Sequence, residues 1–151
     1  MNVIVDARGG SVAWDGQAIV ALATFALERL GLPERCELSV SLVSRDEIAQ
    51  LNGAYRGIDA PTDVLSFPCE SPADVPADAP LIELGDVVIC TDVVEEQRVR
   101  FGLSFEEEAS LMLVHSILHL LGHDHEDERG AAAMEAREKD ILDAYGLTGI
   151  R

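Results

Sequence analysis

Residues 111–125 read Leu-Met-Leu-Val-His-Ser-Ile-Leu-His-Leu-Leu-Gly-His-Asp-His, and they hold all four histidines of the chain. The first eleven of these residues are apolar almost all round, which predicts a buried helix because a surface helix would carry a polar face. Two histidines lie on that helix, and buried imidazoles need partners since an unpaired buried polar group is costly. We therefore expect a central helix over residues 104–121, opened by a capping box of Ser104 and Glu107, that carries a functional site.

Strands and helices alternate on either side of this central helix. Apolar residues at every second position predict a half-buried strand at residues 36–42, and apolar positions at helical spacing predict a helix at residues 14–30. Further strands are expected at residues 3–5, 63–67 and 84–90, and further helices at residues 44–55, 91–100 (capped by Thr91 or Asp92) and 127–145. The order indicates a single domain, residues 1–151, in which helices pack around one small sheet in an α/β or α+β arrangement.

Composition restricts where such a domain works. No stretch of about 20 apolar residues is present, so we expect no membrane span. The first ten residues lack the charged-then-apolar layout of a secretion signal, which favours a cytoplasmic protein. The three cysteines, Cys36, Cys69 and Cys90, are widely spaced and odd in number, which is typical of reduced thiols in a reducing compartment.

The histidines have the spacing of a metal site. His115 and His119 are four residues apart, so a helix places both on one face, about one turn from each other. Gly122 is suited to the left-handed conformation that ends a helix, and the reversing chain can bring His125 back as a third ligand. Imidazole is a favoured ligand of zinc, and three protein ligands indicate an open, catalytic site for one Zn²⁺ ion. The alternative is a set of hydrogen-bonded core histidines.

Neighbouring residues leave further alternatives open. Cys69 or Cys90 could approach the histidines in space and close the site into a structural one. His123 and Asp124 either orient the ligands or face solvent. The spacing His-x3-His-x2-Gly-x2-His also matches the zinc motif of metzincin proteases, but those enzymes carry a glutamate general base directly after the first histidine. Here that position is Ser116, which argues against peptide hydrolysis by their mechanism.

Three blocks of this sequence together resemble a known family. Residues 115–125 are quoted above, residues 52–68 read Asn-Gly-Ala-Tyr-Arg-Gly-Ile-Asp-Ala-Pro-Thr-Asp-Val-Leu-Ser-Phe-Pro, and residues 84–90 read Leu-Gly-Asp-Val-Val-Ile-Cys. They are similar, in the same order, to the signatures of the YbeY family of bacterial metal-dependent endoribonucleases, also called the rRNA maturation factor family. Ser116 departs from the glycine usual in that family.

The resemblance implies a fold, an activity and a set of residues. The fold is an α+β domain with a small mixed sheet, four-stranded here, flanked by helices, and with its metal site on the buried helix and the turn after it. The activity is a zinc-dependent, single-strand-specific endoribonuclease in small-subunit rRNA 3′-end maturation and ribosome quality control. The ligands are His115, His119 and His125, and Arg56 is functionally important. The partners are single-stranded RNA, rRNA and the small ribosomal subunit or its assembly proteins, with neither DNA nor a membrane expected.

Arg56 and the overall charge need separate treatment. The Arg56 guanidinium can hold a phosphate through two hydrogen bonds, although the residue can equally form a surface ion pair with Asp59 or Asp63. Asp63 and Asp86, expected at strand boundaries, are either partners of the site or turn caps. The net charge of −17 argues against phosphate binding over a broad surface, so we expect weak, salt-sensitive binding of isolated RNA or its delivery by a ribosomal partner.

Two other functions remain open from the residues alone. One is a metal-dependent hydrolase of another substrate class, acting on peptides or small amides. The other is a zinc-stabilised ribosome assembly factor without catalysis. For the nuclease itself, no general base can be named, and attack by the ribose 2′-hydroxyl and attack by water are both possible.

Overall fold

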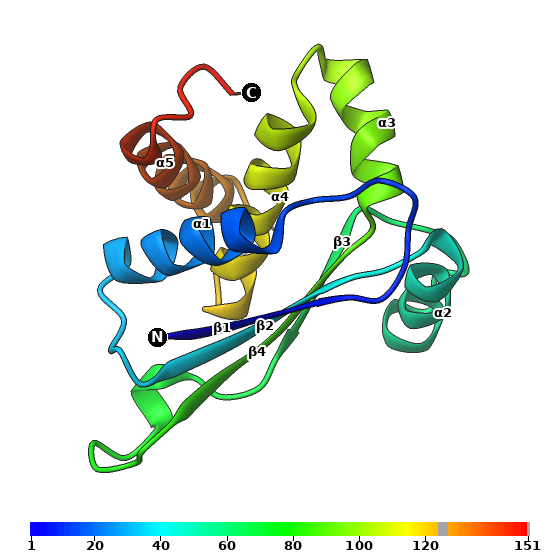
Figure 1. The fold of residues 1–151 in the computed structure, drawn as a ribbon. Coiled ribbons are helices and arrows are strands. Elements are labelled where there is room, and N and C mark those ends of the chain that lie inside the picture. The colour runs from blue at the N-terminus through cyan, green and yellow to red at the C-terminus, as the bar shows by residue number, and fades with distance from the viewer. Residues whose placement is uncertain (124–126, 151) are drawn as a thin grey trace.

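The computed structural model describes residues 1–123 and 127–150. Within them, four strands form one mixed sheet in the order β1-β2-β4-β3 (Figure 1). The strands are β1 (Asn2–Ala7), β2 (Cys36–Leu42), β3 (Val64–Pro68) and β4 (Ile82–Ile89). β1, β2 and β4 run parallel, whereas β3 lies antiparallel to β4 at the edge of the sheet. The prediction of an α+β domain built on a mixed four-stranded sheet is confirmed.

Helices cover both faces of the sheet. They are α1 (Gly16–Arg29), α2 (Arg45–Arg56), α3 (Thr91–Phe101), α4 (Phe105–Leu120) and α5 (Glu128–Tyr145), with a short 3-10 turn at Pro72–Asp74. α1, α4 and α5 pack together over one face around the main hydrophobic core, and α2 lies against the other face (Figure 1). No helix among the described residues is long and apolar enough to cross a membrane.

α4 is the central element that the sequence predicts. Both halves of its capping box form: the Glu107 N–H donates to Ser104 Oγ (3.0 Å), and the Ser104 N–H donates to the Glu107 carboxylate (2.8 Å). Eleven of its sixteen residues are buried. Gly122 ends it with φ at +92°, and its N–H donates to the His119 carbonyl (3.0 Å). Defined start and end points therefore fix the position of the two helical histidines relative to the sheet.

The predicted cap of α3 is wrong. The residue before the helix is Cys90, which makes no side-chain cap hydrogen bond, and Thr91 and Asp92 are the first helical residues. Both side chains instead bind the loop after β1. Thr91 Oγ1 donates to the Val12 carbonyl (2.8 Å), and the Asp92 carboxylate accepts from the Ser11 hydroxyl (2.7 Å) and from backbone N–H groups. A tertiary partner some eighty residues away outweighs the local capping preference.

β4 begins earlier than predicted and contains an irregularity. It starts at Ile82 rather than residue 84, so Asp86 lies inside the strand and not at its boundary. The register of its pairing with β2 shifts between Glu83 and Gly85. Gly85 has φ at +133°, and a Cβ there would meet the Phe67 carbonyl oxygen at 2.2 Å. The glycine thus permits β3 to approach β4 closely, which places β3 beside α4.

Candidate metal and phosphate site

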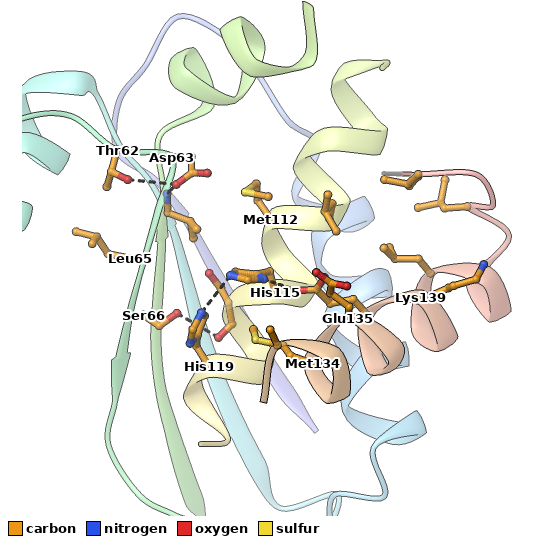
Figure 2. Close-up of a pocket in the computed structure, with 18 of the residues that line it drawn as sticks. Thr62, Asp63, Leu65, Ser66, Met112, His115, His119, Met134, Glu135 and Lys139 are labelled. Atoms are coloured by element: carbon orange, nitrogen blue, oxygen red, sulfur yellow. Dashed lines mark hydrogen bonds and ion pairs between the residues drawn. The ribbon is translucent and has the colours of Figure 1, made fainter. Parts of the chain in front are cut away.

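A cavity of about 1130 Å³ opens between the edge strand β3, the helices α4 and α5, and the C-terminal end of α2. Figure 2 shows His115 and His119 on α4 between Ser66 of β3 and Glu135 of α5. The functional side chains that line it come from four elements and one loop: Arg56, Asp63, Ser66, His115, His119 and Glu138. Segments distant in sequence therefore meet at the site that the histidine spacing indicates.

The histidine pair has the geometry expected from a four-residue spacing. The two rings are 4.6 Å apart between centroids and nearly perpendicular. His115 Nε2 and His119 Nε2 lie 3.0 Å from each other. Both ring edges therefore converge on one position at the floor of the cavity.

Glu138 of α5 completes this arrangement. Its carboxylate contacts His115 Nδ1, and its side chain is 12% exposed. With Nδ1 engaged by a carboxylate, the tautomer that leaves Nε2 free of a proton is favoured, which is the form that binds metals. Sequence reasoning missed Glu138. The available signal was its position on the inward face of the last helix, four residues after Met134 and three before Ile141, which are both buried.

The pair fits a zinc ion. Two nitrogens bound to zinc at about 2.0–2.1 Å in tetrahedral geometry lie roughly 3.3 Å apart, close to the observed 3.0 Å. The predicted third ligand, His125, and the neighbouring Asp124 lie outside the described residues, and the described residues alone contain no group of three metal-binding side chains. The third ligand therefore stays a prediction.

The cysteines do not join the site. Cys90 is fully buried in the small core beneath α2, and burial raises the pKa of its thiol. Cys69 lies in a separate hollow with Glu83 and Asp86. Neither cysteine is among the residues that line the cavity, and Asp86 is also absent from it. His123 is half-buried and likewise does not line the cavity.

Arg56 is the last residue of α2, and it lines the cavity with its side chain exposed. Its side chain makes no hydrogen bond or ion pair with any residue in the ranges 1–123 and 127–150. The alternative partner Asp63 is engaged elsewhere, since its Oδ1 accepts from the Val64 N–H (2.8 Å) and Thr62 Oγ1 (3.2 Å). Asp59 forms no ion pair with it either. The arginine therefore presents an unneutralised cation to the cavity of a chain with net charge −17.

Ser116, the position that differs from the family pattern, is fully buried where α4 faces β3. Ser66 Oγ donates to the Ser116 carbonyl (3.1 Å), a bond that ties the strand to the helix. The Ser116 hydroxyl itself has no hydrogen-bond partner among the described residues. A small side chain is accommodated at this close approach, so the substitution preserves the packing that positions His115.

Fold and site together define a class of protein: a small α+β domain with a helix-borne histidine pair beside an unpaired arginine. A family model described as Endoribonuclease YbeY matches residues 13–146, and the chain belongs to this family. It is 41% identical over 149 residues to Endoribonuclease YbeY of Bacillus subtilis, covering 95% of this chain and 94% of that protein. It is also 46% identical over 129 residues to Endoribonuclease YbeY of Staphylococcus saprophyticus, covering 84% of each.

A solved structure has the same fold. The solution structure of a Thermotoga maritima protein matches with a TM-score of 0.59 and 28% sequence identity. The match covers 95% of this chain and 91% of that chain. The likeness therefore extends over nearly the whole domain.

Proposed function

We propose that this protein is a zinc-dependent endoribonuclease that cleaves single-stranded RNA in small-subunit rRNA 3′-end maturation and in ribosome quality control. The observation that carries the proposal is the meeting of the His115–His119 pair with the unpaired Arg56 in one cavity. Membership of a family whose relatives are named endoribonucleases supports RNA as the substrate. rRNA and the small ribosomal subunit or its assembly proteins are the proposed partners.

His115, His119 and His125 are proposed to hold the zinc ion, with Glu138 fixing the orientation of the first. When bound, the ion supplies a Lewis acid that polarises a phosphoryl oxygen in the cavity. Glu138 accepts the hydrogen bond of His115 Nδ1–H and so keeps Nε2 directed at the shared position. Ser66 holds β3 against α4 and fixes the distance between the strand and the histidines.

Arg56 is proposed to bind the scissile phosphate or its neighbour. A guanidinium can donate two parallel hydrogen bonds to phosphate oxygens, and its charge offsets the negative charge that develops on the phosphate during cleavage. Arg56 is free to do so because no described residue occupies its donors. The nucleophile, either the ribose 2′-hydroxyl or water, follows from the end groups of the products.

Cleavage of single-stranded RNA by matched arginine variants tests this proposal. The wild-type protein, with its metal content measured, is expected to cleave single strands in preference to duplexes. Arg56→Ala should lower the rate about 100- to 1,000-fold, in line with the loss of one charge-stabilising donor, at unchanged zinc content. Arg100→Ala removes an exposed arginine of α3 and should leave the rate unchanged.

Each contrary result points to a particular alternative. Equal cleavage by wild type and Arg56→Ala would mean a contaminating nuclease or a wrong role for the arginine. A wild-type protein that cuts a peptide but not RNA would favour the other hydrolase. An Arg56→Ala variant without nuclease activity that fully supports maturation of the small subunit would favour a zinc-stabilised assembly factor.

A further inference from the structure

Tyr55 is a large, exposed aromatic side chain that lines the cavity. It directly precedes Arg56 in the last turn of α2, it lines the cavity, and 55% of its surface is exposed. Of the exposed large apolar side chains among the described residues, Tyr55 is the one that lines the cavity. Its exposure therefore coincides with the proposed phosphate-binding residue.

The Tyr55 ring is supported from one side. It packs against Phe67 of β3, with ring centroids 4.6 Å apart and planes tilted by 55°. Phe67 in turn packs against the small core that contains Ile48, Leu65 and Val88. The ring is thus held on a rigid base while more than half of its surface remains available. A flat, pre-positioned aromatic surface loses little conformational entropy when a second flat group covers it.

From this geometry we propose that Tyr55 is the stacking platform for one nucleobase of the RNA, next to the phosphate held by Arg56. The inference rests on the proposed function and names a subsite of the same cavity. Bases of a single strand are free to stack on aromatic side chains, whereas bases in a duplex are already stacked on each other. The subsite therefore favours single strands and tolerates any base, because every base has a π-face.

The charge of the chain supports a neutral contact of this kind. With 28 acidic and 11 basic residues, the protein has few cations with which to bind the phosphate backbone. Stacking requires no positive charge, so it can supply affinity that an acidic surface otherwise lacks. The cavity, at about 1130 Å³, exceeds the range of about 300–1,000 Å³ typical of small-molecule sites, so it has room for a base beside a bound phosphate.

The test combines a change in the protein with a change in the RNA. Cleavage of a short single-stranded oligonucleotide is compared with that of a series in which one base at a time is replaced by an abasic site. Tyr55→Ala should raise KM about tenfold on the intact RNA, with kcat changed far less. One abasic position should raise KM of the wild type equally, and at that position Tyr55→Ala should add nothing. Tyr55→Phe should behave as wild type.

One further variant and a folding measurement guard against a structural explanation. Tyr55→Leu retains apolar bulk against Phe67 without a flat ring and should lose the same affinity as Tyr55→Ala, while urea unfolding shows whether each variant is folded. Equal KM for wild type and Tyr55→Ala on every oligonucleotide, with cleavage intact, would overturn the stacking inference alone. A loss that is equal at all abasic positions would also overturn it. Failure of the wild type to bind or cleave any RNA would instead refute the proposed function.

Discussion

Two charged side chains, Asp92 in the first turn of α3 and Arg56 at the end of α2, are placed in opposite ways. At the start of α3, the Asp92 carboxylate accepts hydrogen bonds from the Ser11 hydroxyl and from the Ser11 and Val12 N–H groups. These bonds hold the pKa of Asp92 below its usual value. At the end of α2, Arg56 faces the cavity and has no partner among the described residues. One charge is satisfied inside the fold, and the other is left available.

The contrast separates residues that stabilise the fold from residues that serve a ligand. A polar group whose hydrogen bonds are all made within the chain contributes to folding, whereas one with open capacity facing a cavity is poised for an external partner. The histidine pair lines the same cavity as Arg56, and its two Nε2 atoms lie 3.0 Å apart there. Substitutions in the cavity should therefore change binding and activity more than stability, and substitutions around Asp92 should do the reverse.

The largest effect is expected for His119→Leu, which puts this contrast to its strongest test. Removing a proposed zinc ligand should abolish RNA cleavage and also the stabilisation of the fold by zinc. In the wild type, that stabilisation amounts to about 2.7 kcal/mol when the free zinc concentration is 100 times Kd. Without metal, the variant should unfold at a similar urea concentration, because burial of an apolar side chain offsets the loss of the contact between His119 and His115. Urea unfolding with zinc and with a chelator measures both.

The outcome for His119→Leu can contradict the comparison in two ways. If the metal-free variant is much less stable than the metal-free wild type, His119 contributes to folding in the way that Asp92 does. If zinc still stabilises the variant as strongly as the wild type, the ion binds elsewhere. In either case, the distinction between residues that stabilise the fold, such as Asp92, and residues of the cavity that bind a ligand would be wrong.

An intermediate effect is expected for Glu138→Ala. Groups that orient a metal-bound histidine typically change metal affinity by about 10- to 100-fold, so zinc affinity measured by chelator competition should fall by that factor. Glu138→Gln retains an oxygen acceptor, so its zinc affinity should fall less than that of Glu138→Ala. Glu135→Ala is the matched control, because Glu135 lies one turn earlier on α5 and also lines the cavity. Equal losses in both alanine variants would show that only negative charge matters, not the contact with His115.

Much of this arrangement is predictable from local sequence. Residues 111–121 are apolar almost all round, which predicts the buried helix, and the four-residue spacing predicts that His115 and His119 share a face. Both are confirmed, because these features depend on helix geometry alone. The Ser104 and Glu107 capping box is confirmed for the same reason: its partners are three residues apart.

What sequence reasoning missed depends on contacts between distant segments. Glu138 reaches His115 across 23 residues, and Asp92 binds Ser11 across 81, so no local spacing reports either pair. The opening of β4 at Ile82 and the irregularity at Gly85 follow from how closely β3 approaches, which a single strand's pattern does not encode. The unpaired state of Arg56 is likewise a property of the assembled cavity.

The smallest effect is expected for Asp92→Asn, which tests whether Asp92 stabilises the fold without contributing to activity. Because the folded pKa of Asp92 lies below its unfolded value of about 3.9, the carboxylate contributes stability above that pH, and the contribution is lost as the pH falls through the folded pKa. The variant should lose about 1–2 kcal/mol at pH 7, as expected for hydrogen bonds to a charged acceptor, with kcat unchanged.

Urea unfolding at pH 7 and near pH 3 distinguishes this role of Asp92 from a general effect of charge. The stability difference between wild type and Asp92→Asn should shrink at the lower pH, because the wild-type carboxylate then approaches the neutral state that the amide imitates. Asp78→Asn, in the loop before β4, removes a carboxylate that makes no hydrogen bond to a described residue, and it should change stability little at either pH. If the Asp92→Asn variant is fully folded but has a lower kcat, the start of α3 contributes to catalysis. The separation between this stabilising region and the cavity would then be wrong.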